Sequence, residues 1–305
     1  DYMIPGVNGL DGITQILKND PFMPIVMITG EGSEVVAAKA LQKGAYEYIP
    51  KHLIDKYSIN RAIDSALARA NLKRKMAVQE ADLKDFASML AHDLRAPVRH
   101  INGFMEFIEK DIQEQKYDKI GEHFSYVRTA TSKMNALIDT LYEYTKIDGE
   151  AVFSMIPLEK VMKNTVDTLR GEIQEKSAKV SYENLPLVYG NGVLLMQLFQ
   201  NLISNALKYN ESATPTIDIS AEKHGEDWLV RVKDNGIGID QEYRQKVFMP
   251  FQRLFTEKQY SGTGLGLATC KKIVDRHGGK IWCESKENEG ATFLLTLAPE
   301  EVNLL

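Results

Sequence analysis

The segment VKDNGIGID at residues 232–240 is the most informative about the fold of the C-terminal half of the chain. In the residues leading into it, DWLVRVK (227–233), apolar and polar side chains alternate as in a half-buried strand, which ends directly at Asp234. Gly236 and Gly238 permit a tight turn and the close approach of a ligand, and a carboxylate at a strand end accepts hydrogen bonds from an amine. Taken alone, Asp-Asn-Gly is more typical of a plain hairpin turn.

Other segments on both sides of this turn predict further strands and helices. The expected strands are TIDISAE (216–222), KIWCES (280–285) and ATFLLTL (291–297), and the expected helices are 158–175, 192–209 and 265–277. This mixture predicts an α+β domain whose antiparallel or mixed sheet is covered by helices on one face. We place the domain at residues 155–300.

One of these helices carries polar residues at helical spacing. In QLFQNLISNALKYN (197–210), Asn201 and Asn205 are four residues apart and share one helix face with Lys208. Amide oxygens in this arrangement can ligate a hard cation. By themselves, two such asparagines more often form a solvated face or a cap.

A glycine-rich loop precedes the last predicted helix. SGTGLGLATCKKIV (261–274) places Gly262, Gly264 and Gly266 where the free amide groups of a helix start can meet an anion. The loop does not follow a strand in a βαβ unit, so it is not a dinucleotide-binding fingerprint. A lone motif of this kind is more often a flexible hinge.

The middle of the chain predicts a helical hairpin. Between Ile54 and about Gln115 there is only one proline and one glycine. Mostly apolar residues recur there at steps of three and four, and the pattern resumes after a short break. The two runs are Leu72, Met76, Gln79, Leu83, Phe86 and Leu90, then Ile120, Phe124, Val127, Thr131, Met134, Ile138, Leu141 and Thr145. The apolar stripe of one hairpin is too narrow for the hairpin to bury it by itself, so we expect a homodimer in which two hairpins form a four-helix bundle. A long monomeric helix packed on its neighbours is the alternative.

The first helix of this hairpin contains FASMLAHDLRAPV, residues 86–98. The heptad assigns Leu90 to position a, so His92 falls at position c and faces solvent. Pro97 should bend the helix one turn further on. A neutral imidazole is a nucleophile near pH 7, and the neighbouring Asp93 can accept its other ring proton. We favour His92 over the five other histidines of the chain, which are His52, His100, His123, His224 and His277.

The N-terminal residues predict a parallel α/β layer. PIVMIT (24–29) and AYEYIP (45–50) have the pattern of buried strands, and VVAAKALQKG (35–44) has that of a helix between them. A parallel sheet needs cover on both faces, and only two or three strands are visible here. We therefore expect a truncated layer.

Together, and in this order, four segments resemble the N, G1, F and G2 boxes of the histidine kinase ATP-binding domain, a relative of the gyrase, Hsp90 and MutL ATPases. They are the Asn-bearing helix, the Asp-Gly turn, the segment VFMPFQRLF (247–255) and the glycine loop. The resemblance implies that Asp234 holds the adenine amine of ATP and that Asn205, with Asn201, holds Mg²⁺. It also implies a lid over about 239–261, anchored by Phe248 and Phe251. The implied cofactor-binding residues are Asn201, Asn205, Lys208, Tyr209, Asp234, Gly236, Gly238, Gly262, Gly264 and Gly266, with Lys208 and the last three glycines at the phosphates and Tyr209 near the base.

The hairpin and the N-terminal layer carry two further resemblances. FASMLAHDLRAPV resembles the H box of the histidine kinase dimerisation domain, which implies that His92 is the catalytic phosphoacceptor and that Asp93 assists it. Many members of that family have a Thr or Asn four residues after the histidine, which positions water for dephosphorylation of the partner. Ala96 stands there, so we expect weak phosphatase activity.

The segments DYMIPGVNGL, MITGE and YIPK are similar to the later half of a response-regulator receiver domain. That similarity implies a phosphoacceptor at Asp1 and switch residues at Thr29, Tyr48 and Lys51. His52 departs from the proline that usually follows the lysine. The first strands of a receiver, with their acidic ligands, are missing, and we expect the sequence to be a fragment of a longer chain.

The sequence as a whole predicts a multidomain protein with a partial receiver at 1–68, a coiled-coil linker at 69–85, a dimerisation and phosphotransfer domain at 86–148 and an ATP-binding domain at 155–300. The implied activity is an ATP-dependent protein histidine kinase that passes its phosphoryl group to an aspartate of a separate response regulator. Since no break separates the receiver helix from the coiled coil, we expect the receiver to control the kinase. A non-enzymatic scaffold and a gyrase-like or Hsp90-like conformational ATPase are the alternatives. The ATPase class usually needs a carboxylate on the Asn-bearing helix to activate water, and this chain has Asn201 at that turn.

Composition excludes several other classes. A net charge of −5, from 37 basic and 42 acidic residues, argues against a protein that coats nucleic acid. The basic cluster Arg69, Lys73, Arg74 and Lys75 is best explained as a solvated helix face. No apolar run is long enough to span a membrane, and no signal peptide is visible. Cys270 and Cys283 form no disulfide framework, so we expect a cytoplasmic protein.

Overall fold

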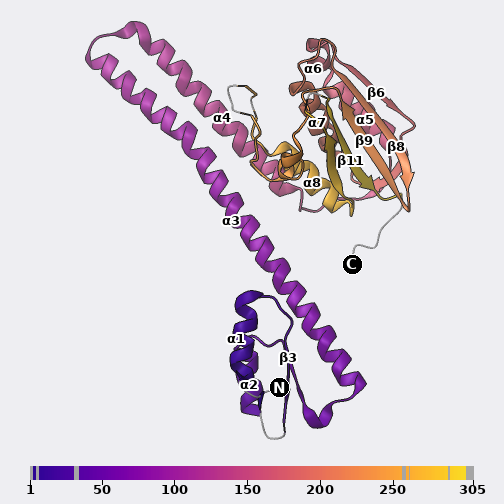
Figure 1. Ribbon diagram of the computed structural model, residues 1–305. Coiled ribbons are helices and arrows are strands. Elements are labelled where there is room, and N and C mark those ends of the chain that lie inside the picture. Colours follow the sequence, from indigo (N-terminus) through magenta and orange to yellow (C-terminus); the bar gives the residue numbers. More distant parts are fainter. Residues whose placement is uncertain are drawn as a thin grey trace. The chain divides into compact units, whose positions relative to one another are not determined.

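The computed structural model describes residues 3–4, 7–30, 34–255, 259–260, 262–287 and 289–299. It divides into two compact units, Asp1–Ser88 and Met89–Leu305, and Figure 1 shows their elements. Asp1, the expected phosphoacceptor of the receiver, lies outside the described residues. In the part of the chain that the structure describes, no helix is long and apolar enough to cross a bilayer.

The first unit contains the predicted strand–helix–strand layer. β3 and β4 pair in parallel, with Thr29 opposite Pro50. The helix expected at 35–44 is present as α2 (Glu34–Gln42), and Gly44 follows it at a φ of +107°, a backbone conformation that favours glycine. The elements are β1 (Met3–Ile4), β2 (Val7–Asn8), α1 (Gly9–Asn19), β3 (Val26–Thr29), α2 (Glu34–Gln42), β4 (Glu47–Pro50) and the short helix η1 (Lys51–Leu53).

The long helix α3 (Lys56–Gln113) begins in this unit and contacts the layer through its basic residues. The guanidinium of Arg69 donates to the backbone oxygen of Tyr46 at 3.1 Å. Arg74 pairs with Asp20 at 3.4 Å and lies over the ring of Phe22 at 5.8 Å. Both arginines are exposed, as expected of a solvated basic face, and they also join the helix to the layer.

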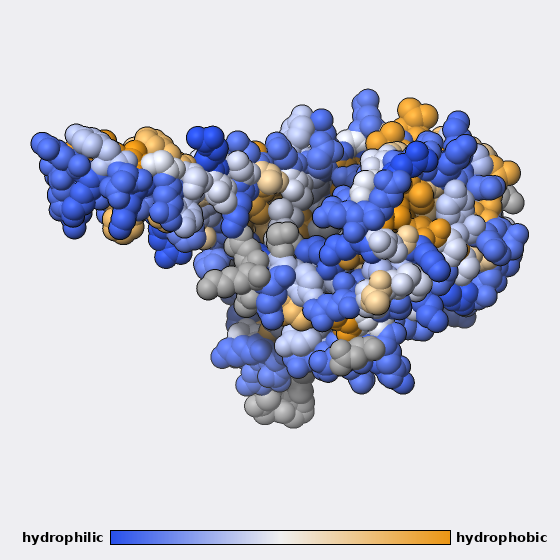
Figure 2. Space-filling view, turned by 90° about the horizontal axis from the view of Figure 1, so that it is seen from above, coloured by the Kyte–Doolittle hydropathy of each residue, from blue (hydrophilic) through white to orange (hydrophobic). Residues whose placement is uncertain are grey.

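The second unit begins with the predicted helical hairpin. α3 continues through Pro97 without interruption, the short helix η2 (Tyr117–Lys119) makes the turn, and α4 (Ile120–Lys146) returns. Expected seam residues of the hairpin such as Phe124 and Ile138 are exposed in the single chain. Figure 2 shows hydrophobic residues interrupting the hydrophilic surface of the hairpin. Such a stripe is what a second copy would cover in a four-helix bundle.

The rest of the second unit is an α+β domain with a five-stranded mixed sheet. The strand order is β10-β11-β9-β8-β6, in which β6 and β8 are parallel and all other pairs are antiparallel. The strands are β6 (Lys179–Glu183), β8 (Thr216–His224), β9 (Asp227–Asp234), β10 (Ile281–Ser285) and β11 (Ala291–Leu297), with β5 (Ser154–Pro157) and β7 (Leu187–Gly190) in a separate pair. The helices are α5 (Leu158–Thr168), α6 (Arg170–Glu175), α7 (Gly192–Lys208) and α8 (Gly266–Arg276), with the short helices η3 (Gln241–Tyr243) and η4 (Lys246–Phe248).

The core lies between the helices and one face of this sheet (Figure 1). α7 contributes Leu198, Phe199 and Leu202, all fully buried, against strand residues such as Ile217 and Val230. Because α7 buries this apolar face, its asparagines lie on the side that turns away from the core.

The end of the hairpin is joined to this domain by specific contacts. Ile147, which directly follows α4, is buried in the core of the α+β domain. Lys272 of α8 pairs with Asp148 at 2.7 Å and donates to the backbone oxygen of Tyr144 at 3.0 Å. Arg276 donates to the backbone oxygen of Gly149. These contacts anchor the segment that leaves the hairpin.

Candidate functional site

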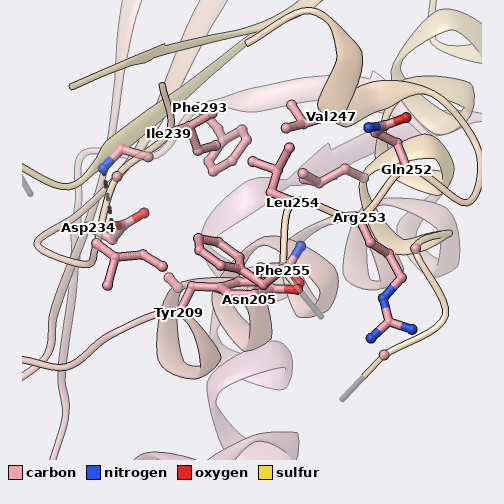
Figure 3. Close-up of a pocket in the computed structure, with 17 residues that line it drawn as sticks. Asn205, Tyr209, Asp234, Ile239, Val247, Gln252, Arg253, Leu254, Phe255 and Phe293 are labelled. Carbon is pink, nitrogen blue, oxygen red and sulfur yellow. Dashed lines mark hydrogen bonds between the residues drawn. The ribbon is translucent and has the colours of Figure 1, made fainter. Parts of the chain in front are cut away.

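A pocket lies at the C-terminal end of α7, beside the turn that follows β9 and the segment 247–255 (Figure 3). Its lining is apolar apart from a few polar groups, as is common for small-molecule sites. It brings together six of the residues singled out from the sequence: Asn205, Tyr209, Asp234, Gly238, Gly262 and Gly264.

Asp234 is the buried acidic group of this pocket, with 8% of its surface exposed. Its Oδ1 accepts from the backbone N–H of Gly236 at 2.8 Å and from that of Ala291 at 3.1 Å. Burial raises the pKa of this carboxyl, while the two N–H donors lower it. Figure 3 shows the other carboxylate oxygen directed into the pocket, where it can accept a hydrogen bond from an amine.

The glycines after Asp234 allow backbones to pack closely around the site. A Cβ added to Gly236 would lie 2.4 Å from the backbone oxygen of Tyr209. One added to Gly238, which has a φ of +75°, would lie 2.0 Å from the backbone oxygen of Lys286. Both contacts are with backbone and cannot yield easily, so a larger residue would push the glycine motif away from the end of α7 at Gly236 and from the turn after β10 at Gly238.

The polar face of α7 meets the start of α8. Asn201 Oδ1 and Asn205 Nδ2 both lie 3.8 Å from the Cβ position at Gly266. Asn205 lines the pocket, whereas Asn201, one turn earlier, is not among its lining residues. Of the two asparagines, Asn205 is the one whose amide can reach a ligand in this pocket.

Lys208 places a positive charge next to the glycine loop. Its Nζ donates to the hydroxyl of Tyr209 at 2.9 Å and lies 4.4 Å from the centroid of that ring. A Cβ added to Gly262, at a φ of +152°, would lie 2.7 Å from the same Nζ. A lysine ammonium beside glycine amides is a suitable environment for an anion such as a phosphate.

The segment 247–255 joins the pocket to the core. Phe248 and Phe251 are buried, and Phe248 belongs to the hydrophobic core, where it meets the ring of Phe293 edge to face with centroids 6.2 Å apart. Phe251 has a φ of +59°, which is unusual for a bulky residue, and a Cβ added to Gly264 would lie 2.9 Å from its Cα. The glycine loop thus lies directly against the backbone of this segment.

Sequence reasoning missed Asn235, which lies between two of the predicted residues. Its Oδ1 accepts from the Asn210 side chain and from the backbone of Thr216, each at 2.8 Å. Its amide nitrogen donates to Ser212 Oγ at 3.2 Å and to the backbone oxygen of Thr214 at 3.1 Å. All four bonds hold the loop after α7 beside Asp234. In the sequence, Asn235 was explained by turn formation alone, although its position between Asp234 and Gly236 indicated a role in the site.

His92 lies on α3 with 77% of its side chain exposed, as the heptad predicts. Its Nδ1 is 3.0 Å from Oδ1 of Asp93, so in the tautomer that carries its proton on Nδ1 the ring donates to the carboxylate and Nε2 keeps its lone pair. Ala96 follows one helical turn later and brings no hydrogen-bonding side chain. The contact between His92 and Asp93 is the one that the sequence suggests.

The receiver residues lie at one edge of the parallel strand pair. Thr29 ends β3 and is buried, and Lys51 comes directly after β4. Because Thr29 is opposite Pro50, the hydroxyl and the lysine both belong to the carboxyl edge of the sheet. Tyr48, two residues before Pro50, is partly exposed.

No cluster of three or more His, Cys, Asp or Glu side chains suited to a metal ion occurs within the described residues. A cation here would need ligands from an amide and from a bound anion. Asn205 supplies a side-chain oxygen of the kind that Mg²⁺ accepts, and Mg²⁺ commonly keeps few protein ligands beside phosphates. The residues present therefore fit Mg²⁺ held together with a nucleotide.

Family models match three successive parts of the chain. The response regulator receiver domain matches residues 1–64. The His Kinase A (phospho-acceptor) domain matches residues 82–150. The model of the histidine kinase-, DNA gyrase B-, and HSP90-like ATPase matches residues 190–301. The second match contains His92, and the third contains Asn205 and Asp234.

Curated relatives are similar over most of this chain. Cyanobacterial phytochrome A of Nostoc is 39% identical over 78% of the chain and 31% of its own length. The phytochrome-like protein Cph1 of Synechocystis is 33% identical over 87% of the chain and 35% of its own length. The chain thus spans about a third of these relatives.

Among solved structures, the histidine kinase ThkA in complex with the response regulator protein TrrA has a similar fold. Its TM-score is 0.57 at 24% identity, over 77% of this chain and 67% of that one.

Proposed function

Because the chain belongs to the sensor histidine kinases of two-component systems and carries a receiver domain, we propose that it phosphorylates its own His92 with ATP. The phosphoryl group then passes to an aspartate of a separate response regulator. The reaction class is an ATP-dependent phosphotransfer to protein histidine.

The observation that carries this proposal is the geometry of Asp234. Two backbone donors, Gly236 and Ala291, bind one carboxylate oxygen and leave the other directed into an apolar pocket. A buried carboxylate with one free acceptor suits the exocyclic amine of adenine between apolar walls. Tyr209 and Phe255, whose ring centroids are 5.9 Å apart, both line the pocket and offer surfaces to the base.

The phosphates of ATP extend toward the glycine loop. Lys208 and the amides around Gly262, Gly264 and Gly266 bind them, and Asn205 ligates Mg²⁺, with Asn201 on the same face. Bound Mg²⁺ neutralises charge on the transferring phosphoryl group. Gly236 and Gly238 hold the adenine end of the site through their close backbone contacts.

At the acceptor, Asp93 holds the Nδ1 proton of His92 and fixes the ring. Nε2 of His92 attacks the γ-phosphorus in line, the new P–N bond forms as the bond to the bridging oxygen breaks, and ADP leaves. Ala96 offers no group to position water, so phosphatase activity toward a phosphorylated partner is weak.

The partners of the chain follow from the same domains. The exposed apolar stripe of the hairpin supports a homodimer, and the relative ThkA was solved with a response regulator. The receiver, with Asp1, Thr29, Tyr48 and Lys51, regulates the kinase. The domains are 1–68, 69–85, 86–148 and 155–300.

The test is incubation with γ-labelled ATP and Mg²⁺, with a gel kept at alkaline pH. Label should enter the wild type and be absent from His92→Gln. His100→Gln is the matched control, because His100 is also exposed on α3. Equal label in wild type and His92→Gln would contradict the proposal. Free phosphate without labelled protein would favour a conformational ATPase, and neither product would favour a scaffold.

A further inference from the structure

Ser285, the last residue of β10, makes hydrogen bonds through both its side chain and its backbone beside the nucleotide pocket. Its Oγ accepts from the backbone N–H of Ile239 at 2.8 Å and donates to the backbone oxygen of Gly290 at 2.7 Å. Its own backbone oxygen accepts from the guanidinium of Arg244. The residue is buried, so these bonds are protected from competing water.

The bond to Gly290 connects Ser285 to Asp234 through one peptide group. The carbonyl of Gly290 and the N–H of Ala291 belong to the same planar peptide. Ser285 donates to the carbonyl end of that peptide, and the N–H end donates to Oδ1 of Asp234 at 3.1 Å. A hydrogen bond at one end of a peptide both orients it and strengthens the bond at its other end.

The second hydrogen bond of the Ser285 hydroxyl joins it to Ile239, in the segment that follows Asp234. From Asp234 the chain runs through Gly238 to Ile239, whose N–H returns to Ser285 Oγ. Gly290 has a φ of +83°, and a Cβ there would lie 2.1 Å from the backbone oxygen of Asp234. The turn between β10 and β11 is therefore pressed against the end of β9, and the Ser285 hydroxyl joins the turn to the glycine motif.

We propose that Ser285 is a positioning residue for adenine recognition, which acts by holding the Gly290–Ala291 peptide against Asp234. With Oδ1 engaged by two backbone donors, only the other oxygen of Asp234 is free, and it points into the pocket. Loss of the hydroxyl releases the peptide, so that Asp234 can turn and its free oxygen no longer faces one fixed direction. This inference rests on the proposed ATP site and adds a residue that determines its specificity.

The test compares the dissociation constants of ATP and inosine triphosphate for the full chain. Inosine triphosphate has an oxygen in place of the 6-amine, so the ratio of the two constants reports on Asp234. In Ser285→Ala the affinity for ATP should fall about three- to tenfold, while that for inosine triphosphate stays nearly constant. Ser285→Thr, which keeps the hydroxyl, should restore the ratio.

Thr296→Val is the matched control. Thr296 is a buried residue of β11 whose hydroxyl accepts from the backbone of Lys280 at 2.9 Å, away from the pocket. It should lose stability without any change in the ATP preference. Amide exchange at Ala291 gives a readout that needs no nucleotide, and it should quicken in Ser285→Ala but not in Thr296→Val.

Three outcomes are decisive. If the wild type prefers ATP and Ser285→Ala has the same ratio of dissociation constants, the role of Ser285 is overturned and the proposed function stays intact. A wild type with no preference for ATP would overturn both. If Ser285→Ala does not fold, Ser285→Cys keeps a weaker donor and should give an intermediate ratio, whereas a wild-type ratio there would contradict the proposal.

Discussion

Nδ1 of His92 and Oδ1 of Asp93 are 3.0 Å apart on a helix face where the histidine is otherwise open to solvent. Neighbours in sequence on a helix do not usually face each other, so this contact depends on the rotamers of the two side chains. A carboxylate here favours the tautomer with its proton on Nδ1, and under the proposed function this leaves Nε2 free to attack.

Asp93→Asn should slow the labelling of His92 by about 10- to 100-fold, because the amide no longer selects the ring tautomer or offsets the charge that develops on the ring. ATP affinity should not change, because Asp93 does not line the pocket that contains Asp234. The rate is measured by single-turnover labelling at saturating ATP. Asp85→Asn on the same helix is the control, and an equal loss of rate there would show a general effect of helix charge.

Asp234→Asn should weaken ATP binding by about 10- to 100-fold, because it replaces a charged acceptor of the adenine amine by an amide. The expected loss is in affinity and not in the labelling rate at saturation. Fluorescence titration with ATP and a single-turnover assay separate the two. A variant that binds normally but labels slowly would contradict the assignment of Asp234 to the base.

The pH dependence of Asp234 follows from its burial, which raises the pKa of the carboxyl above its ordinary value of 3.8. ATP binding requires the ionised form, so affinity should fall as pH falls through the raised pKa. The stability of the fold changes in the opposite direction and rises as pH falls, because the native state holds this proton more tightly than the unfolded chain. At neutral pH Asp234→Asn should therefore have a higher free energy of unfolding than the wild type, and this difference should narrow as pH falls toward 3.8. Parallel denaturation curves of the two proteins measure it, and a widening gap would contradict the sign.

The sequence was sufficient to place the residues whose position depends on local spacing. Asp234 with Gly236 and Gly238 follows a strand directly, and Asn205 with Lys208 lies one helical turn apart, so pattern and order predicted where they lie, while their roles stay predictions. The bonds of Ser285 and Asn235 join turns far apart in the chain, and no local period predicts such partners. The short strands β5, β6 and β7 were also missed. They are only four or five residues long, and strands this short are hard to separate from loops even where, as in KVSYE of β6, polar and apolar residues alternate.

His277 provides a test of a buried neutral histidine away from the pocket. Its Nδ1 donates to the backbone oxygen of Ile273 at 2.7 Å, and its Nε2 accepts from the backbone N–H of Asn191 at 3.0 Å. Burial lowers the pKa of the ring below 6.5. The unfolded chain then binds a proton before the native state does, so stability should fall as pH drops below about 6.5.

His277→Ala should cost about 2–3 kcal/mol of unfolding free energy at pH 7.5, from two lost hydrogen bonds and a cavity. It should also remove part of the loss of stability below pH 6.5. Urea denaturation at several pH values measures both effects. The control is His224→Ala, on an exposed residue of β8. An equal acid sensitivity in wild type and His277→Ala would assign that sensitivity to other groups.

The contact between Arg74 and Asp20 predicts that the basic residues of α3 stabilise the receiver part of the chain. The ion pair is partly exposed, at 3.4 Å, and the ring of Phe22 adds a cation–π contact at 5.8 Å. Arg74→Ala should therefore cost only about 1 kcal/mol in the stability of this unit. Arg74→Glu should cost more, because it places two carboxylates together, and Asp20→Arg in the same chain should recover most of that difference. Hydrogen exchange of β3 and β4 measures the local stability. Arg61→Glu, at another exposed arginine of the same helix, is the charge control, and an equal effect there would mean that the general charge of α3 and not this pair is responsible.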